Sequence, residues 1–257
     1  MLSLGLMSGT SMDGIDAALI ETDGLHQINA IEHLHVPYNQ HTKQLLKSAE
    51  RAMHAAQGNL AQAKTNFPRS LKDYLSQELL ITTPQTHDTT FDDVITLSTH
   101  LHETAVRQLL EHTKIQSDDI DVIGYHGQTL FHQPKARITY QMGNAHQLAH
   151  RLQIPVVYDI RQNDIQHGGQ GAPFAPLYHQ ALAVRDHHLP LVVLNCGGLA
   201  NMSLILGDSL DDLIGFDTGP GNGLMDAFIK KKTQGRETMD RDGHYGLQGT
   251  VQEPILQ

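Results

Sequence analysis

Residues 5–16 read GLMSGTSMDGID, a glycine- and serine-rich loop between two apolar segments, 2–7 and 15–21, that favour β-strands. Gly9 and Gly14 allow close backbone approach and positive φ. Backbone N–H groups in such a loop can hold phosphate oxygens, and an ordinary tight hairpin turn is the competing interpretation. Three hydroxyl side chains stand beside these N–H groups: Ser8, Thr10 and Ser11.

Two better-known motifs do not fit this loop. Ile15 stands where a P-loop requires lysine, so a Walker A assignment fails. Ser8 lacks the G-x-S-x-G frame of a nucleophile elbow. A serine hydrolase that uses Ser8 or Ser11 is therefore only a third, low-ranked alternative for the function. Asp13 could hold a magnesium ion, directly or through water.

Composition limits the partners of the chain. Its 257 residues contain 18 Lys and Arg against 28 Asp and Glu, a formal net charge of −10, which opposes binding to nucleic acid or to an anionic membrane. Cys196 is the single cysteine and is expected to be a buried structural thiol in a reducing compartment. No apolar run approaches the length of a membrane span, so the sequence predicts a cytoplasmic protein.

The pattern of the first two thirds predicts an α/β arrangement. Further strands are expected at 28–36, 121–125 and 154–158, and a helix at 40–57. A second helix is expected to begin with Asp92 or Asp93 as its cap, while 68–88 has no clear assignment. One face of that second helix carries the apolar residues Val94, Leu97, Leu101, Ala105 and Leu109.

After an expected helix at 178–184 the pattern starts again, with strand, glycine turn and strand in 189–206. Another strand at 212–216 and a helix at 223–232 follow. We therefore place a domain boundary near 186–190 and expect two related halves that face each other across a cleft.

Two further glycine-rich stretches are candidate ligand sites. In NCGGLANMS, Gly197 and Gly198 could approach phosphates, and a plain β-hairpin turn is the alternative. In FDTGPGNGLMDAF, Asp217 is expected to end a strand and the following glycines to open a helix, whose N-terminus would favour an anion. Those glycines are Gly219, Gly221 and Gly223.

Candidate catalytic residues follow the short central strands. Asp159 ends the strand at 154–158 and could act as a general base, or it could be a structural partner of Arg161. His126 and Gln128 leave another strand and could hydrogen-bond a polar substrate, although a lone histidine is more often structural. A zinc H-E-x-x-H motif fails at Val106, and no metal ligand set is assigned.

Six motifs together resemble the anhydro-N-acetylmuramic acid kinase family: LGLMSGTSMDGIDAAL, IGYHGQTLFH, YQMGNAHQLA, VVYDIRQNDIQHGGQGAPFAP, LNCGGLANMS and GFDTGPGNGLMDAF. The resemblance implies two ribonuclease-H-like domains around an ATP cleft, as in actin, heat-shock ATPases and sugar kinases. It implies domains at 1–187, with the phosphate loop and sugar-binding strand ends, and at 188–257, the second incomplete.

The resemblance also implies the reaction and its residues. ATP and Mg²⁺ would be the cofactors, and the anhydro-amino-sugar would be hydrolysed at its 1,6-anhydro ring and phosphorylated on O6. Asp159 would be the catalytic base, and His126 and Gln128 would face the sugar. A homodimer is a candidate assembly. The implied ATP contacts are Gly9, Thr10, Ser11, Met12, Asp13, Gly14, Ile15, Asp16, Gly197, Gly198, Asp217, Gly219, Gly221 and Asn222.

One departure from the family concerns length, since its members continue for roughly a hundred residues beyond this chain. We therefore expect a partly exposed apolar face on the second half. The main alternative to a kinase is a truncated, catalytically inactive actin-like protein that binds nucleotide or sugar.

Overall fold

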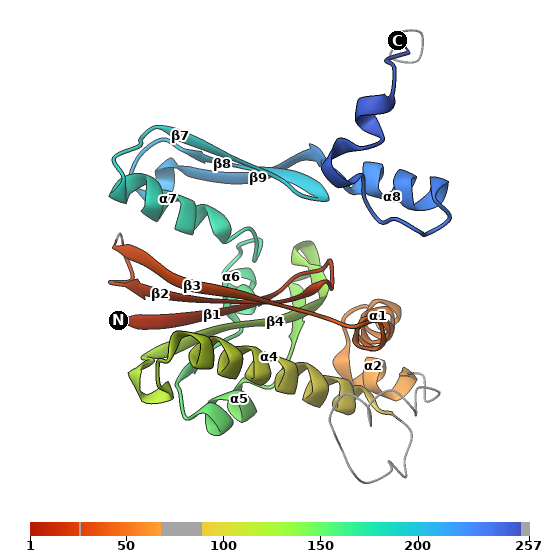
Figure 1. Cartoon of the computed structure of the whole chain (residues 1–257). Helices are drawn as coiled ribbons and strands as arrows, with labels where there is room; N and C mark the ends of the chain where they lie inside the picture. Colours follow the sequence, from red (N-terminus) through yellow and green to blue (C-terminus); the bar gives the residue numbers. More distant parts are fainter. Residues whose placement is uncertain (26, 68–88, 253–257) are drawn as a thin grey trace. The chain divides into compact units, whose positions relative to one another are not determined.

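A computed structural model describes residues 1–25, 27–67 and 89–252, so the unassigned stretch 68–88 lies outside the described residues. The chain divides into two compact units, Met1–Ala172 and Pro173–Gln257, and each is described here by itself. Both units combine helices with a β-sheet (Figure 1). The predicted α/β class is therefore confirmed at this level.

The larger unit is built on a six-stranded mixed sheet in the order β3-β2-β1-β4-β5, with β6 also paired to β4. Strand β1 is antiparallel to β2 and parallel to β4, while β6 is parallel to β4. The three strands predicted near the N-terminus, at 2–7, 15–21 and 28–36, are thus confirmed. The strands are β1 (Leu2–Ser8), β2 (Gly14–Thr22), β3 (Ile28–Pro37), β4 (Val122–Gln133), β5 (Ile138–Met142) and β6 (Val156–Val157).

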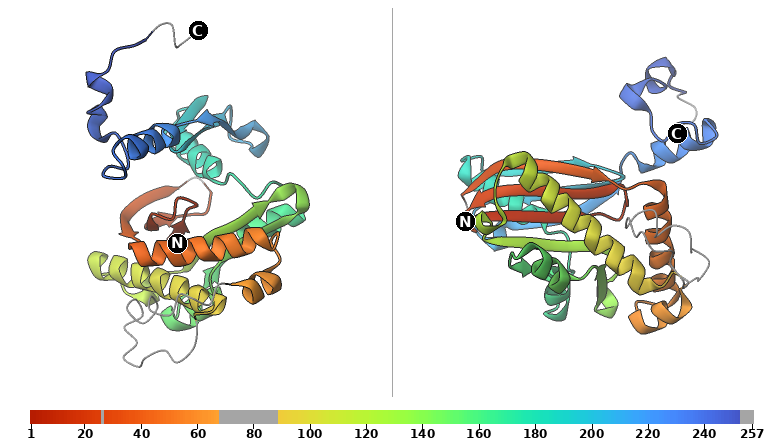
Figure 2. Two further views of the ribbon diagram at one scale, coloured as in Figure 1. Left: turned by 90° about the vertical axis from the view of Figure 1, so that its right-hand side faces the viewer. Right: turned by 60° about the horizontal axis from the view of Figure 1, so that its bottom comes forward.

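Helix α4 (Phe91–Thr113) lies diagonally across one face of this sheet (Figure 2). The predicted apolar stripe is buried except for Leu101, which is half-buried against the same core. Thr90 caps the helix and Asp93 completes a capping box, so the predicted Asp cap was placed two or three residues too late. The other helices of the unit are α1 (Gln40–Ala55), α2 (Leu60–Asn66), α5 (Ala145–Leu152) and α6 (Ile160–Gln166).

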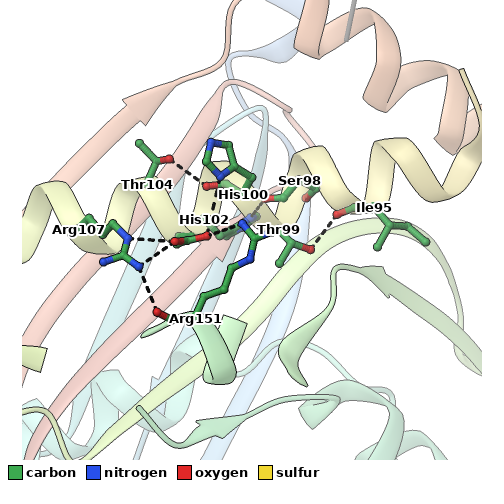
Figure 3. Close-up of polar contacts among 9 residues, drawn as sticks. Ile95, Ser98, Thr99, His100, His102, Thr104, Arg107 and Arg151 are labelled. Carbon is green, nitrogen blue, oxygen red and sulfur yellow. Dashed lines mark hydrogen bonds and ion pairs between the residues drawn. The ribbon is translucent and has the colours of Figure 1, made fainter. Parts of the chain in front are cut away.

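Glu103 ties helix α4 to helix α5. Its nearly buried carboxylate accepts from Arg107 at 2.9 Å and from Arg151 at 3.0 Å, and Arg107 also donates to the Arg151 carbonyl (Figure 3). Burial works to raise the pKa of Glu103, but the hydrogen bonds from the two arginines hold it below its usual value. This contact holds the C-terminal end of α5 against α4, and at the other end of α5 the Asn144 N–H donates to Thr99 Oγ1 of α4 at 3.0 Å.

The smaller unit contains an antiparallel sheet in the order β7-β8-β9 together with two helices. Gly215 in β9 fits closely under Pro173 and Pro176, and His179 contacts Ser203, so α7 belongs with this sheet. The compact units therefore divide before α7, whereas the predicted domain boundary follows it. The elements are α7 (Ala175–Arg185), β7 (Leu191–Cys196), β8 (Leu199–Ile205), β9 (Leu213–Pro220) and α8 (Gly223–Lys232).

Two expectations for the smaller unit have different outcomes. Exposed apolar residues alternate along β7 and β9, as predicted for an apolar face. The predicted burial of Cys196 is wrong, because this residue is the last of β7 and its thiol is exposed. The alternating residues are Val192, Leu194, Ile214 and Phe216.

Short 3-10 turns lie between elements at Ser117–Asp119, Pro134–Ala136 and Leu210–Asp212, and after α8 at Arg241–Gly243 and Gly246–Gln248. Within the described part of the chain, no helix has the length and apolar character that crossing a bilayer requires.

Candidate active site

The parallel strands of the larger unit bring three predicted segments to one edge of the sheet. Strand β1 ends at Ser8, directly opposite Gln128 of β4. Val157 of β6 pairs with Gly124 of the parallel strand β4. Asp159 and His126 each come two residues after this pair, so they lie at the same level of the sheet. Ligands of α/β proteins bind at the carboxyl ends of parallel strands, which makes this edge the candidate site.

The loop between β1 and β2, residues 9–13, forms a compact turn closed by the Met12 N–H on the Gly9 carbonyl at 3.1 Å. Asp13 accepts from Ser11 Oγ at 2.7 Å and from the Gly14 N–H at 3.1 Å. Partial burial works to raise the pKa of Asp13, but these hydrogen bonds hold it below its usual value. A charged carboxylate at the tip of this loop suits a cation.

The predicted ATP contacts in this region divide into exposed and buried residues. Met12 and Ile15 point into the core, and a side chain at Gly14 would meet the Val36 carbonyl at 2.5 Å. Only backbone atoms of these residues could face a ligand. The loop residues that keep exposed surface are Gly9, Thr10, Ser11 and Asp13. Asp16 lies outside the loop, on β2, where its carboxylate contacts His35 Nδ1 at 2.9 Å.

A cavity of about 360 Å³ opens at the same edge of the sheet. Asp159 lines it with an exposed side chain and a left-handed backbone, φ 56°, and its carboxylate does not cap helix α6. Non-glycine residues held in this conformation cluster at functional sites. The other lining residues are Leu60, Tyr125, His126, Gly127, Thr139, Tyr140, Gln141, Gly143, Ala145, Tyr158 and Gln162.

His126 lines this cavity as a neutral ring whose two nitrogens are both engaged. Its Nδ1 donates to the Gly127 carbonyl at 2.7 Å, and its Nε2 accepts from Arg161 Nε at 2.6 Å. Burial and then the charge of Arg161 lower the pKa of His126 to about 4. Arg161 also donates to the Gly171 carbonyl at 2.6 Å, so it joins His126 to the glycine-rich segment after α6.

Sequence reasoning missed the aromatic side of the cavity. Burial raises the pKa of Tyr140 to about 12, helped by the nearby Asp92 and Asp159, so the Tyr140 hydroxyl remains a proton donor. Tyr158 Oη contacts His146 Nε2 at 3.0 Å. Tyr140 begins the motif YQMGNAHQLA, but no spacing rule signals that it lies near Asp159.

Protonation of His102, which packs edge-on against Tyr125 of the cavity wall, is expected to destabilise the larger unit in mild acid. Burial lowers the pKa of His102 to about 4, against the opposing hydrogen bond to the Ser98 carbonyl. An unfolded histidine titrates near about 6.5, so the unfolded chain binds the proton more readily. Stability is therefore lost as the pH falls below about 6.5, by about 2 kcal/mol between pH 7 and pH 5.

Urea unfolding of the wild type and of His102→Gln at these two pH values measures this contribution. We expect the variant to lose about 2 kcal/mol less than the wild type on acidification. His244→Gln, which alters an exposed histidine of the smaller unit, serves as the matched control. Equal acid sensitivity of wild type and His102→Gln would exclude His102 as the source.

In the smaller unit, the two predicted glycine sites contact each other. The N–H groups of Gly221 and Gly223 donate to the Gly198 carbonyl at 3.1 and 3.2 Å, and the Asn222 N–H donates to the Gly197 carbonyl at 2.9 Å. These three N–H groups at the start of α8 are therefore already paired within the protein. The predicted anion site at this helix N-terminus has fewer free donors than the sequence suggested.

Asp217 lies inside β9 rather than at its end, because the strand continues to Pro220. It lines a second cavity of about 350 Å³, together with Asn195, Asn201 and His179. Gly219 has a φ of 155° and open space where a side chain would be. The predicted ATP contacts thus fall in both compact units, and their convergence on one nucleotide stays a prediction.

Over the ranges 1–25, 27–67 and 89–252, no group of three His, Cys, Asp or Glu side chains is arranged to hold a metal ion. The sequence assigned no metal ligand set, and Asp13 stays a residue that could hold magnesium directly or through water.

Comparison with known proteins agrees with the motifs. The fold and site define a mixed α/β protein with a ligand cavity at the ends of parallel strands. The chain belongs to the anhydro-N-acetylmuramic acid kinase family, whose model matches residues 1–73 and 51–257.

Relatives named anhydro-N-acetylmuramic acid kinase match nearly the whole chain. Those from Azorhizobium caulinodans, Methylorubrum populi and Bradyrhizobium diazoefficiens are 46%, 40% and 37% identical over 100%, 99% and 98% of it. The chain spans only 62%, 63% and 61% of their lengths. Among solved structures, YeaZ from Pseudomonas aeruginosa aligns with 86% of this chain and 68% of its own at 14% identity, but its TM-score of 0.28 supports no argument.

Proposed function

We propose that this chain carries the catalytic part of an ATP-dependent kinase that opens the 1,6-anhydro ring of anhydro-N-acetylmuramic acid and phosphorylates O6. One observation carries the proposal. Gln128 contacts Gly9 of the β1–β2 loop, while His126, two residues earlier, lines the cavity of Asp159. A phosphate donor on the loop and a sugar in the cavity would therefore lie at one edge of one sheet.

In the proposed reaction, Asp159 accepts a proton from water while the water oxygen bonds to the anomeric carbon. The bond from that carbon to O6 breaks, and O6 attacks the γ-phosphorus of ATP as ADP leaves. The β1–β2 loop would hold the phosphates through backbone N–H groups and the hydroxyls of Thr10 and Ser11. Mg²⁺ bound near Asp13 would offset the charge that develops on the phosphoryl oxygens.

We also propose the domain organisation and the second set of nucleotide contacts that the family resemblance implies. The predicted domains at 1–187 and 188–257 would each be ribonuclease-H-like. Residues of the smaller unit would contact the other side of the nucleotide: Gly197, Gly198, Asp217, Gly219, Gly221 and Asn222. The cytoplasmic location and the homodimer stay predictions.

The test is to incubate the chain with ATP, Mg²⁺ and anhydro-N-acetylmuramic acid, beside the same chain extended to the length of its relatives. We expect the extended form to produce ADP and the sugar 6-phosphate. Product from neither form would refute the kinase proposal. Product from the extended form alone would mean that the 257-residue chain itself does not catalyse the reaction, which leaves the alternative that it only binds ligand.

A further inference from the structure

A network of buried polar groups lies beneath the β1–β2 loop. Ser8 Oγ is 2.5 Å from Gln128 Oε1 and 2.9 Å from the Tyr38 hydroxyl. Ser8 and Gln128 are completely buried, and Tyr38 is 6% exposed. The network joins the end of β1, the middle of β4 and the residue that follows β3.

The proton positions in this network follow from its donors and acceptors. Gln128 Oε1 is an acceptor only, so the Ser8 hydroxyl donates to it and Tyr38 donates to Ser8. Burial raises the pKa of Tyr38 in spite of its hydrogen bond with Ser8, so the phenol keeps the proton that it donates. Buried networks of this kind lose stability when one member is removed.

The same residues hold both ends of the loop. Gln128 Nε2 donates to the Gly9 carbonyl at 2.8 Å, and the Tyr38 N–H donates to the Asp13 carbonyl at 2.8 Å. Residues 10–12 therefore span two fixed carbonyl groups.

Gln128 points away from the cavity that His126 lines, although only Gly127 separates them. Gly127 has a φ of 71°, and a side chain on it would meet the Met142 carbonyl at 2.6 Å. This glycine lets β4 send one side chain to the cavity and the other under the loop. The hydrogen bonds of Gln128 to Ser8 and Gly9 therefore favour a place under the loop over the predicted contact with sugar.

We infer that Tyr38 and Gln128 are positioning residues that fix the backbone of the β1–β2 loop for nucleotide phosphates without touching the ligand. This inference rests on the proposed function for the identity of the ligand. It predicts that their loss weakens nucleotide binding and leaves sugar binding unchanged.

Binding of Mg·ADP and of anhydro-N-acetylmuramic acid should be measured by calorimetry for the wild type, Tyr38→Phe and Gln128→Met. We expect about tenfold weaker Mg·ADP binding in Gln128→Met, equivalent to about 1.4 kcal/mol, because this variant loses the bond to the Gly9 carbonyl. Tyr38→Phe keeps the N–H that binds the Asp13 carbonyl and loses only the hydroxyl on Ser8, so its loss should be smaller. Sugar affinity should stay within about twofold of wild type in both variants. Tyr140→Phe, in the sugar cavity, should show the opposite pattern. Tyr245→Phe removes an exposed hydroxyl of the smaller unit and should change neither affinity.

Amide hydrogen exchange of the ligand-free chain tests the positioning role without any nucleotide. The Met12 amide should exchange about tenfold faster in Gln128→Met and by a smaller factor in Tyr38→Phe, while the amides of Ala17 and Leu19 in β2 keep their protection and report an intact fold. Unchanged Met12 exchange, or equal weakening of both ligands, would overturn the inference. If Met12 responds but the wild type binds no Mg·ADP, the positioning role stands and the proposed function fails.

Discussion

Asp159→Asn is expected to lower the turnover of anhydro-N-acetylmuramic acid about 10³-fold in any form of the protein that makes product. Asparagine keeps the size and backbone conformation of the residue, but its amide cannot accept the proton of the attacking water. General base catalysis contributes about 10²–10⁴-fold to such reactions. Steady-state kinetics with saturating ATP measures the change in kcat, and the KM for ATP should stay within about twofold because Asp159 lines the sugar cavity rather than the loop.

Asp118→Asn is the matched control for this substitution. It makes the same change at an exposed carboxylate of the same unit, outside the residues that line the Asp159 cavity. The control should keep the turnover of the wild type. A kcat of wild-type size in Asp159→Asn, or a loss confined to the KM for ATP, would remove Asp159 from the role of base.

Gly221→Ala is expected to disrupt the junction of the two glycine segments in the smaller unit. A Cβ at this position would overlap the Gly197 carbonyl oxygen, which is backbone and cannot rotate away. The three hydrogen bonds that join residues 197–198 to 221–223 would be lost or distorted. We expect a destabilisation of about 2 kcal/mol or more in urea unfolding of this unit.

Gly198→Ala offers a close control, because a Cβ there meets nothing within 4 Å and its carbonyl still accepts the same hydrogen bonds. Its stability should stay within about 0.5 kcal/mol of the wild type. If Gly198 faces nucleotide phosphates, this variant should weaken Mg·ADP binding at unchanged stability. Equal stability of Gly221→Ala and the wild type would contradict the close contact.

The long, regular elements of the fold were predictable from the sequence. The hairpin at the N-terminus and helix α4 have clear apolar periodicity, and both are found where the pattern places them. The short helices α2, α5 and α6 were missed because seven or eight residues give at most two turns of apolar periodicity, even in α5, whose Leu148 and Leu152 are buried. Strand β5 was missed because it pairs only with the outer part of β4, beyond the predicted end of that strand.

The sequence motifs of the candidate site were predictable, but the directions in which their side chains point were not. Asp159 and His126 line one cavity, although His126 lies inside β4, which continues to Gln133, and not at the predicted strand end. The direction of Gln128 depends on the left-handed backbone of Gly127, which no local pattern specifies. The lining by Tyr140 and Tyr158 arises from strand pairing between distant segments, so it required the three-dimensional structure.

The most direct test of the account is to run the reaction in ¹⁸O-labelled water with unlabelled ATP and to examine the product by mass spectrometry. We expect one ¹⁸O on the anomeric carbon and none in the phosphoryl group, since water attacks carbon and O6 attacks phosphorus. Fragmentation that separates the sugar from the phosphate locates the label. Release of ¹⁸O-labelled phosphate without any sugar 6-phosphate would show that water attacks ATP itself, and would contradict the account.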